Sequence, residues 1–170
     1  MVTPYYNKAS QEGLIESYSY IEKRVSTPII LYNVPSRTGV NIKPETYLEL
    51  SKLPLINAAK EASGDISALA QSMALCGDNL NFYSGNDDQI TALMALGGKG
   101  VISVLANCMP KETHDMVFAY VNGDTATATK MQLDLLDFIN DLFIDNGDFG
   151  NGEISGGIFH GDPTEYKLCG

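Results

Sequence analysis

The chain is short of the residues that build metal centres and disulfide scaffolds. Its 170 residues include no tryptophan, three cysteines and two histidines. Cys76, Cys108 and Cys169 are widely scattered and form no CxxC pair. We therefore expect a protein of a reducing compartment, without a disulfide framework. His114 and His160 alone do not supply a typical zinc site.

Basic residues and long apolar runs are also scarce. Eleven Lys and Arg stand against 21 Asp and Glu, which leaves a formal net charge of −10. A chain with this charge repels nucleic-acid phosphates and anionic lipid surfaces. No apolar run approaches the ~20 residues that span a bilayer, and the first dozen residues lack the pattern of a secretory signal. We therefore expect a cytoplasmic protein that binds neither nucleic acid nor membranes.

What the chain does contain is an alternation of short apolar runs and helical segments. Hydrophobic residues make up 44% of the chain, enough to bury the core of one medium domain. Strands are predicted over residues 27–33, 55–60, 80–84 and 100–105, and helices over 10–25, 45–52, 66–75 and 90–96. This order predicts an α/β fold with a parallel sheet, either a (β/α) barrel or a doubly wound sheet. Four strands are too few to close an eight-stranded barrel.

The last third of the chain changes character. Residues 110–122 and 126–143 predict two successive helices. Residues 145–170 are rich in glycine and acids and predict a loop or disorder. Two motifs within this tail are incomplete: residues 150–155 lack the third glycine of GxGxxG, and residues 145–153 lack a ligand that an EF-hand needs. We expect neither nucleotide nor calcium binding there.

Lys60 and Tyr32 are the first candidates for chemistry. Lys60 ends a predicted strand at the edge where active sites of parallel barrels gather. Apolar surroundings favour the neutral amine, which attacks carbonyl groups. Tyr32 closes the preceding strand at the same level and is suited to proton transfer. The alternatives are that Lys60 is simply exposed to solvent where its strand ends, and that Tyr32 only lines the barrel.

Three loop segments carry further candidates. Arg37 lies in the loop PSRTG and is suited to binding a substrate carboxylate, with a salt bridge to a neighbouring acid as the alternative. Tyr5 and Tyr6 are adjacent in a segment predicted to be extended, so their side chains would point in opposite directions and could serve two surfaces. The alternative is that both pack as ordinary surface aromatics. Residues 84–88 offer backbone amides to an anion, or simply cap a helix through Asp87 or Asp88.

Five segments occur in an order and spacing typical of one known family: TPYYN, YNVPSRTG, KEASGD, YSGNDD and GGKGVISVLAN. Together they resemble the dihydrodipicolinate synthase family of pyruvate-dependent class I aldolases, over roughly residues 1–144. The resemblance implies a (β/α)8 TIM barrel followed by helices. This chain would contain the end of strand 4 through strand 8, hence an incomplete barrel over residues 1–109, C-terminal helices over 110–144 and a divergent tail over 145–170.

The resemblance also implies catalytic roles. Lys60 would form a Schiff base with pyruvate, and the derived enamine would attack L-aspartate 4-semialdehyde in lysine (diaminopimelate) biosynthesis. Tyr32 would donate and accept protons, and Tyr6 would join the proton relay of a partner subunit. No metal or organic cofactor is implied.

Binding and assembly roles follow from the same resemblance. Arg37 would hold the carboxylate of the second substrate, and its presence favours the synthase over the N-acetylneuraminate lyase branch. Ile102 and Gly85 would line the pyruvate pocket. Tyr5 and Tyr6 would lie at the tight interface of a homotetramer built as a dimer of dimers.

One departure from the family concerns the segment before TPYYN. Members carry three strands, most of a fourth and a threonine pair that binds the pyruvate carboxylate there, and this chain has none of them. We expect exposed strand edges, a hydrated Lys60 with a nearly normal pKa, and weak or no activity of the chain alone. The alternatives are another pyruvate-dependent aldolase, similar to N-acetylneuraminate lyase, and a non-catalytic assembly fragment.

Overall fold

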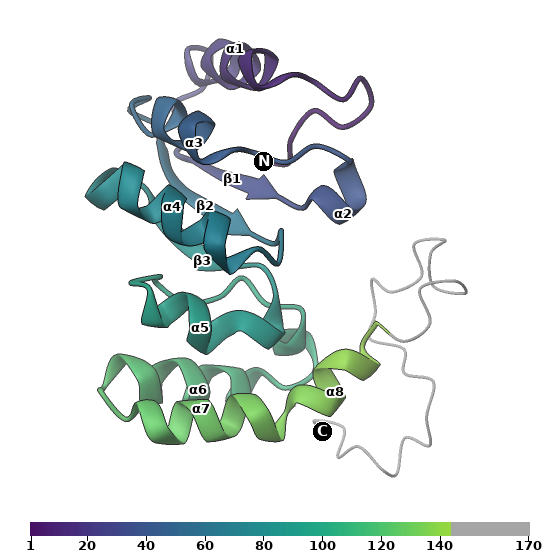
Figure 1. The fold of residues 1–170 in the computed structure, drawn as a ribbon, viewed down its shortest axis with the longest axis vertical. Coiled ribbons are helices and arrows are strands. Elements are labelled where there is room, and N and C mark those ends of the chain that lie inside the picture. The colour runs from purple at the N-terminus through teal and green to yellow at the C-terminus, as the bar shows by residue number, and fades with distance from the viewer. Residues whose placement is uncertain (144–170) are drawn as a thin grey trace. The chain divides into compact units, whose positions relative to one another are not determined.

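Three parallel strands form the sheet of this protein. The computed structural model describes residues 1–143. Strands β1 (Ile29–Asn33), β2 (Ile56–Glu61) and β3 (Asn81–Ser84) pair in the order β1-β2-β3, with both pairs parallel (Figure 1). The predicted α/β fold with a parallel sheet is therefore confirmed.

Short segments flank the sheet on both sides. Val2 bridges Tyr32 in parallel, and the Met1 amine donates to the Ile30 carbonyl at 2.6 Å. At the other side, Val101 bridges Ser84.

The prediction of a full strand over residues 100–105 is wrong. Three hydrogen bonds join this segment to β3: from the Lys99 N–H to the Phe82 carbonyl, from the Ser84 N–H to the Gly100 carbonyl and from the Ile102 N–H to the Ser84 carbonyl. Because β3 ends at Ser84, the segment has a partner for only a few residues. It then turns into the 3-10 helix η3 (Leu105–Asn107).

The helices of residues 1–102 begin where capping and proline signals place them. Side chains of Ser10 and Asp65 accept hydrogen bonds from the first turns of α1 and α4, and prolines open α2 and α3. The bounds are α1 (Gln11–Glu22), α2 (Pro35–Thr38), α3 (Pro44–Leu50), α4 (Ile66–Cys76), η1 (Gly77–Asn79), η2 (Asp87–Gln89) and α5 (Ile90–Ala95). The first helix ends three residues earlier than predicted.

The core lies where α1, α3 and α4 cover one face of the sheet (Figure 1). Leu14 and Tyr18 of α1 and Leu31 of β1 are completely buried in it. Tyr47 of α3 packs edge-on against Phe82 of β3, with ring centroids 5.4 Å apart. Burying a side chain of this size stabilises a fold by roughly 1.5–3 kcal/mol, so this face anchors the strands that carry Tyr32 and Lys60.

Residues 103–143, the rest of the described chain, belong to a second compact unit. It contains η3, α6 (Pro110–Val121), α7 (Thr125–Asp134) and α8 (Leu136–Asp141). The helix predicted over 126–143 is interrupted at Leu135, although helical hydrogen bonds from Leu135 to Met131 and from Ile139 to Leu135 persist. The two compact units divide between residues 102 and 103. The boundary predicted from the sequence, between residues 109 and 110, stays a prediction. None of the helices within residues 1–143 is long and apolar enough to cross a membrane.

Gly98 occupies a position without room for a side chain. A Cβ atom there would lie 1.9 Å from Leu93 Cδ2 and 2.9 Å from the Leu93 carbonyl oxygen. We expect Gly98→Ala to lower the free energy of unfolding by about 1–3 kcal/mol, measured by urea denaturation. Gly13→Ala is the matched control. Its Cβ would make ordinary contacts at 3.5 Å inside α1, so it should stabilise the chain by roughly 0.5–1 kcal/mol. Equal midpoints for the two variants would contradict this account.

Candidate active site

Three residues in register form the centre of the candidate site. Lys60 on β2 pairs with Tyr32 on β1 and with Tyr83 on β3, each near the C-terminal end of its strand. All three side chains are half-buried, while the residues after them are buried. The Lys60 Nζ atom lies over the Tyr32 ring, 4.4 Å from its centroid. The structure thus brings together the two residues that the sequence selected first.

Partial burial of Lys60 shifts the protonation equilibrium of its amine toward the neutral form. Partial burial lowers the pKa of the Lys60 amine below the 10.5 of an ordinary lysine, and the buried Asp87 opposes this shift in part. The expectation of a hydrated Lys60 with a nearly normal pKa is therefore wrong. Strands β1 and β3 and the turn at Gly85 flank the side chain closely enough to remove water from it.

Gly85 follows β3 and adjoins the Lys60 side chain. A Cβ atom at this position would lie 3.0 Å from Lys60 Cγ and Cε and 2.7 Å from Ala62 Cβ. Only glycine leaves this space to the lysine. Ile102 reaches the same strand end through its N–H bond to the Ser84 carbonyl at 2.8 Å, and 37% of its surface is exposed. A role of either residue in binding pyruvate stays a prediction.

Arg37 and the two adjacent tyrosines lie on exposed segments. Arg37 belongs to α2, a single helical turn, where the sequence predicted a loop; Pro35 starts this turn, and Gly39 ends it with φ of +65°. The extended conformation predicted at Tyr5 and Tyr6 is also wrong, because residues 5–8 form a turn that the Lys8 N–H bond to the Tyr5 carbonyl closes. Tyr6 is 95% exposed, and its interface role stays a prediction.

A buried polar cluster next to the site escaped sequence reasoning. Glu61 follows Lys60 directly, yet only 7% of it is exposed, and Asn33 and Tyr47 donate hydrogen bonds to its carboxylate. Burial and the adjacent Glu61 raise the pKa of Tyr47 well above its ordinary value of 10. Sequence reasoning ended the strand at Lys60, whereas β2 includes Glu61; a charged residue directly after the predicted strand was the available signal.

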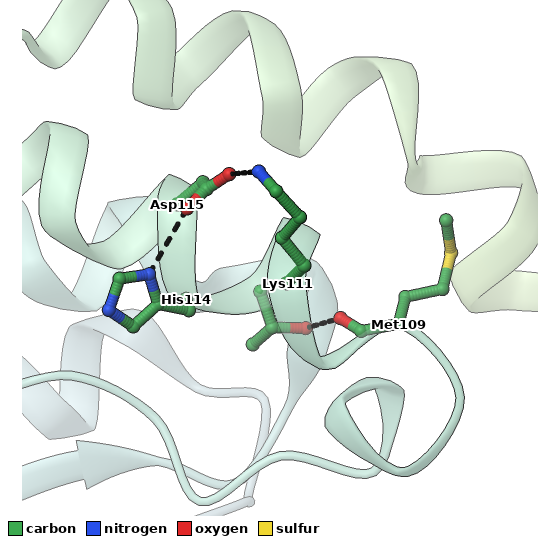
Figure 2. A network of polar contacts seen from close by, with 5 residues as sticks. Met109, Lys111, His114 and Asp115 are labelled. Carbon is green, nitrogen blue, oxygen red and sulfur yellow. Dashed lines mark hydrogen bonds and ion pairs between the residues drawn. The ribbon is translucent and has the colours of Figure 1, made fainter. Parts of the chain in front are cut away.

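A second polar cluster lies on α6 and is exposed. Asp115 pairs with Lys111, and its Oδ1 atom lies 3.1 Å from His114 Nδ1 (Figure 2). The buried Thr113 hydroxyl donates to the Met109 carbonyl at the start of the same helix. Within residues 1–143, no three His, Cys, Asp or Glu side chains gather closely enough to hold a metal ion. His160, Cys169 and the incomplete motifs of residues 145–155 lie outside the described residues.

The comparisons with known proteins agree on one family. The sequence matches the model of the Dihydrodipicolinate synthetase family over residues 1–149. The chain belongs to this family. Among family relatives, 4-hydroxy-tetrahydrodipicolinate synthase 1 of Clostridium acetobutylicum is 54% identical over 170 residues, which cover 99% of this chain and 58% of that protein.

Solved structures of the dihydrodipicolinate synthase family show the same arrangement. The enzyme from Thermotoga maritima is 37% identical, with a TM-score of 0.83. The match covers 86% of this chain and 51% of the Thermotoga chain. The enzyme from Acinetobacter baumannii, solved in complex with pyruvate, is also 37% identical, with a TM-score of 0.82. That match covers 86% of this chain and 50% of the Acinetobacter chain. The chain thus spans about half the length of these family members, and its sheet and helices are consistent with part of their barrel.

Proposed function

We propose that this chain carries the lysine-bearing part of a 4-hydroxy-tetrahydrodipicolinate synthase. Such a lyase condenses pyruvate with L-aspartate 4-semialdehyde in lysine biosynthesis. The observation that carries the proposal is the half-buried Lys60 amine, held over the Tyr32 ring at the C-terminal edge of a parallel sheet. The pyruvate complex of the A. baumannii relative supports the choice of first substrate.

The chemistry assigned to Lys60 is imine formation. The neutral amine attacks the ketone carbon of pyruvate, a C–N bond forms, and the carbonyl oxygen leaves as water. Loss of a proton from the pyruvate methyl group then gives the enamine, whose carbon attacks the aldehyde. Tyr32, on the neighbouring strand, is placed to exchange protons with these species. Lowering of the Lys60 pKa by burial supports this role, since a larger fraction of the amine is then neutral.

The remaining residues extend the proposal to the whole protein. Strands β1, β2 and β3 would be strands 5, 6 and 7 of the complete barrel, with residues 1–2 ending strand 4 and residues 100–102 belonging to strand 8. Arg37 would bind the carboxylate of the second substrate, and Gly85 and Ile102 would line the pyruvate pocket. The two exposed tyrosines, Tyr5 and Tyr6, would meet a partner subunit in a cytoplasmic homotetramer.

Reductive trapping tests the proposed chemistry. The purified chain is incubated with pyruvate and borohydride, and adducts are located by intact mass and peptide mapping. We expect one pyruvyl adduct, at Lys60, and none in Lys60→Ala. Trapping should rise with pH, because higher pH increases the neutral amine, and it should level off below pH 10.5 since burial lowers the Lys60 pKa. Equal labelling of other lysines, or none in a folded chain, would refute the assignment. Full condensation by the chain alone is expected to be weak.

A further inference from the structure

A row of buried polar residues lies one position beyond the candidate site. Asn33, Glu61 and Ser84 are paired across the three strands, and their exposed fractions are only 1%, 7% and 1%. They directly follow Tyr32, Lys60 and Tyr83. Because successive side chains of a strand point to opposite faces, each strand presents one residue to the site and the next to the core.

Both carboxylate oxygens of Glu61 accept hydrogen bonds. Its Oε1 atom accepts hydrogen bonds from Asn33 Nδ2 at 3.1 Å and from the Ser63 N–H at 2.7 Å. Its Oε2 atom accepts from Asn33 at 3.1 Å and from the Tyr47 hydroxyl at 2.7 Å. All of these groups donate, which suits a carboxylate that only accepts.

These bonds connect parts of the chain that are distant in sequence. Asn33 belongs to β1, Tyr47 to α3, and Ser63 to the loop after β2. The orientation of Asn33 is itself fixed, since its Oδ1 atom accepts from the Ile42 N–H at 3.1 Å. The Glu61 backbone carbonyl also accepts from the Gly85 N–H at 2.7 Å. Glu61 therefore connects β1, α3, the loop after β2 and the turn after β3.

We propose that Glu61 is a positioning residue for Lys60. Its carboxylate, anchored by Asn33, Tyr47 and Ser63, fixes the C-terminal ends of β1 and β2 and thereby holds the Lys60 amine over the Tyr32 ring. Glu61 faces the core, so it touches no substrate. The inference deepens the proposed function and rests on it.

A purely structural role explains this arrangement less well. Replacing a buried, fully bonded charged group by apolar residues is often neutral or stabilising, so such a group is weak evidence for stability. An apolar residue would fill the same side of β2, as the completely buried Ala59 does two positions earlier. What apolar residues would not supply is a side-chain link between β1, α3 and the loop after β2, directly beside Lys60.

Three variants of the chain test the inference. Glu61→Gln keeps an acceptor for Asn33 and Ser63, and the Tyr47 hydroxyl turns to accept from the new amide. Glu61→Ala removes every side-chain link and keeps the backbone bond to Gly85. Leu50→Ala, at a completely buried position of α3, is the matched control for lost stability.

Two measurements are made on each folded variant. The first is the rate of pyruvate trapping at Lys60. The second needs no pyruvate: it is the pH midpoint of Lys60 labelling by methyl acetimidate, read by peptide mapping. The groups that face Lys60 and influence this midpoint are Asp87, Tyr32 and Tyr83, and none of the variants changes them.

We expect Glu61→Ala to slow trapping about tenfold or more, since small displacements of a reacting group have effects of this size or larger. Its labelling midpoint should move up toward the 10.5 of an ordinary lysine. Glu61→Gln and Leu50→Ala should keep the wild-type midpoint. A wild-type midpoint in Glu61→Ala, or an equal shift in Leu50→Ala, would overturn the inference.

Failure of the proposed function gives a different result. If the wild-type chain traps no pyruvate but Glu61→Ala still shifts the midpoint, the assigned chemistry fails while the positioning of the amine stands. If Glu61→Ala does not fold, Tyr47→Phe removes a single link to Oε2. It should shift the midpoint in the same direction by a smaller amount, and an unchanged midpoint would reject the inference.

Discussion

Replacing Gly85 with alanine is expected to lower the rate of pyruvate capture by Lys60 about 10²-fold, since misplacing a reacting group by about 1 Å has effects of this order. The added Cβ atom would lie 3.0 Å from Lys60 Cγ and Cε and 2.7 Å from Ala62 Cβ. The lysine side chain is the more flexible neighbour, so it would move and leave its place over the Tyr32 ring. Borohydride trapping, with folding checked by circular dichroism, measures the effect.

A second substitution separates the two contacts that the new methyl group would make. The double variant Gly85→Ala with Ala62→Gly removes the 2.7 Å contact but keeps both contacts to Lys60. We expect its capture of pyruvate to stay low. Recovery of the wild-type rate would show that Gly85 is needed for backbone packing and not for the space that Lys60 occupies.

Tyr32→Phe is expected to slow pyruvate capture about 10²-fold or more, the usual contribution of a positioned acid or base. Phenylalanine keeps the ring over which Lys60 Nζ lies, 4.4 Å from the centroid, and removes only the hydroxyl. The change therefore separates proton transfer from the packing of the amine against an aromatic face. Single-turnover trapping with pyruvate, followed by mass spectrometry, gives the rate.

Tyr83→Phe is the matched control for the Tyr32 variant. Tyr83 pairs with Lys60 from the opposite strand and is half-buried like Tyr32. We assign no proton transfer to its hydroxyl, so this variant should capture pyruvate at nearly the wild-type rate. Similar losses in both variants, or no loss in Tyr32→Phe, would show that the Tyr32 hydroxyl has no specific role.

The sequence predicted the parallel sheet and the pairing of Tyr32 with Lys60 because these features depend on local patterns. Short apolar runs that alternate with capped helices define parallel strands, and the strand ends then fall at one edge. Helix starts were also predictable, since Ser10 and Asp65 cap the first turns through their own side chains.

Other features depend on contacts between distant residues, and local patterns do not reveal them. Whether residues 100–105 form a full strand depends on how far β3 extends beside them, and β3 ends at Ser84. Burial of Glu61 depends on donors from β1 and α3, which lie 28 and 14 residues away in the chain. The partial dehydration of Lys60 likewise arises from neighbours on both flanking strands.

The alternation of Lys60 and Glu61 limits how the gene for this protein can change in length. A single codon gained or lost within β2 would move every later side chain of the strand to the opposite face. The carboxylate would then lose its hydrogen bonds to Asn33, Tyr47 and Ser63, and the ammonium would enter the buried core face of the strand. Insertions and deletions are therefore tolerable only in the connections before Ile56 or after Ser63, where an added residue leaves the two faces of β2 unchanged.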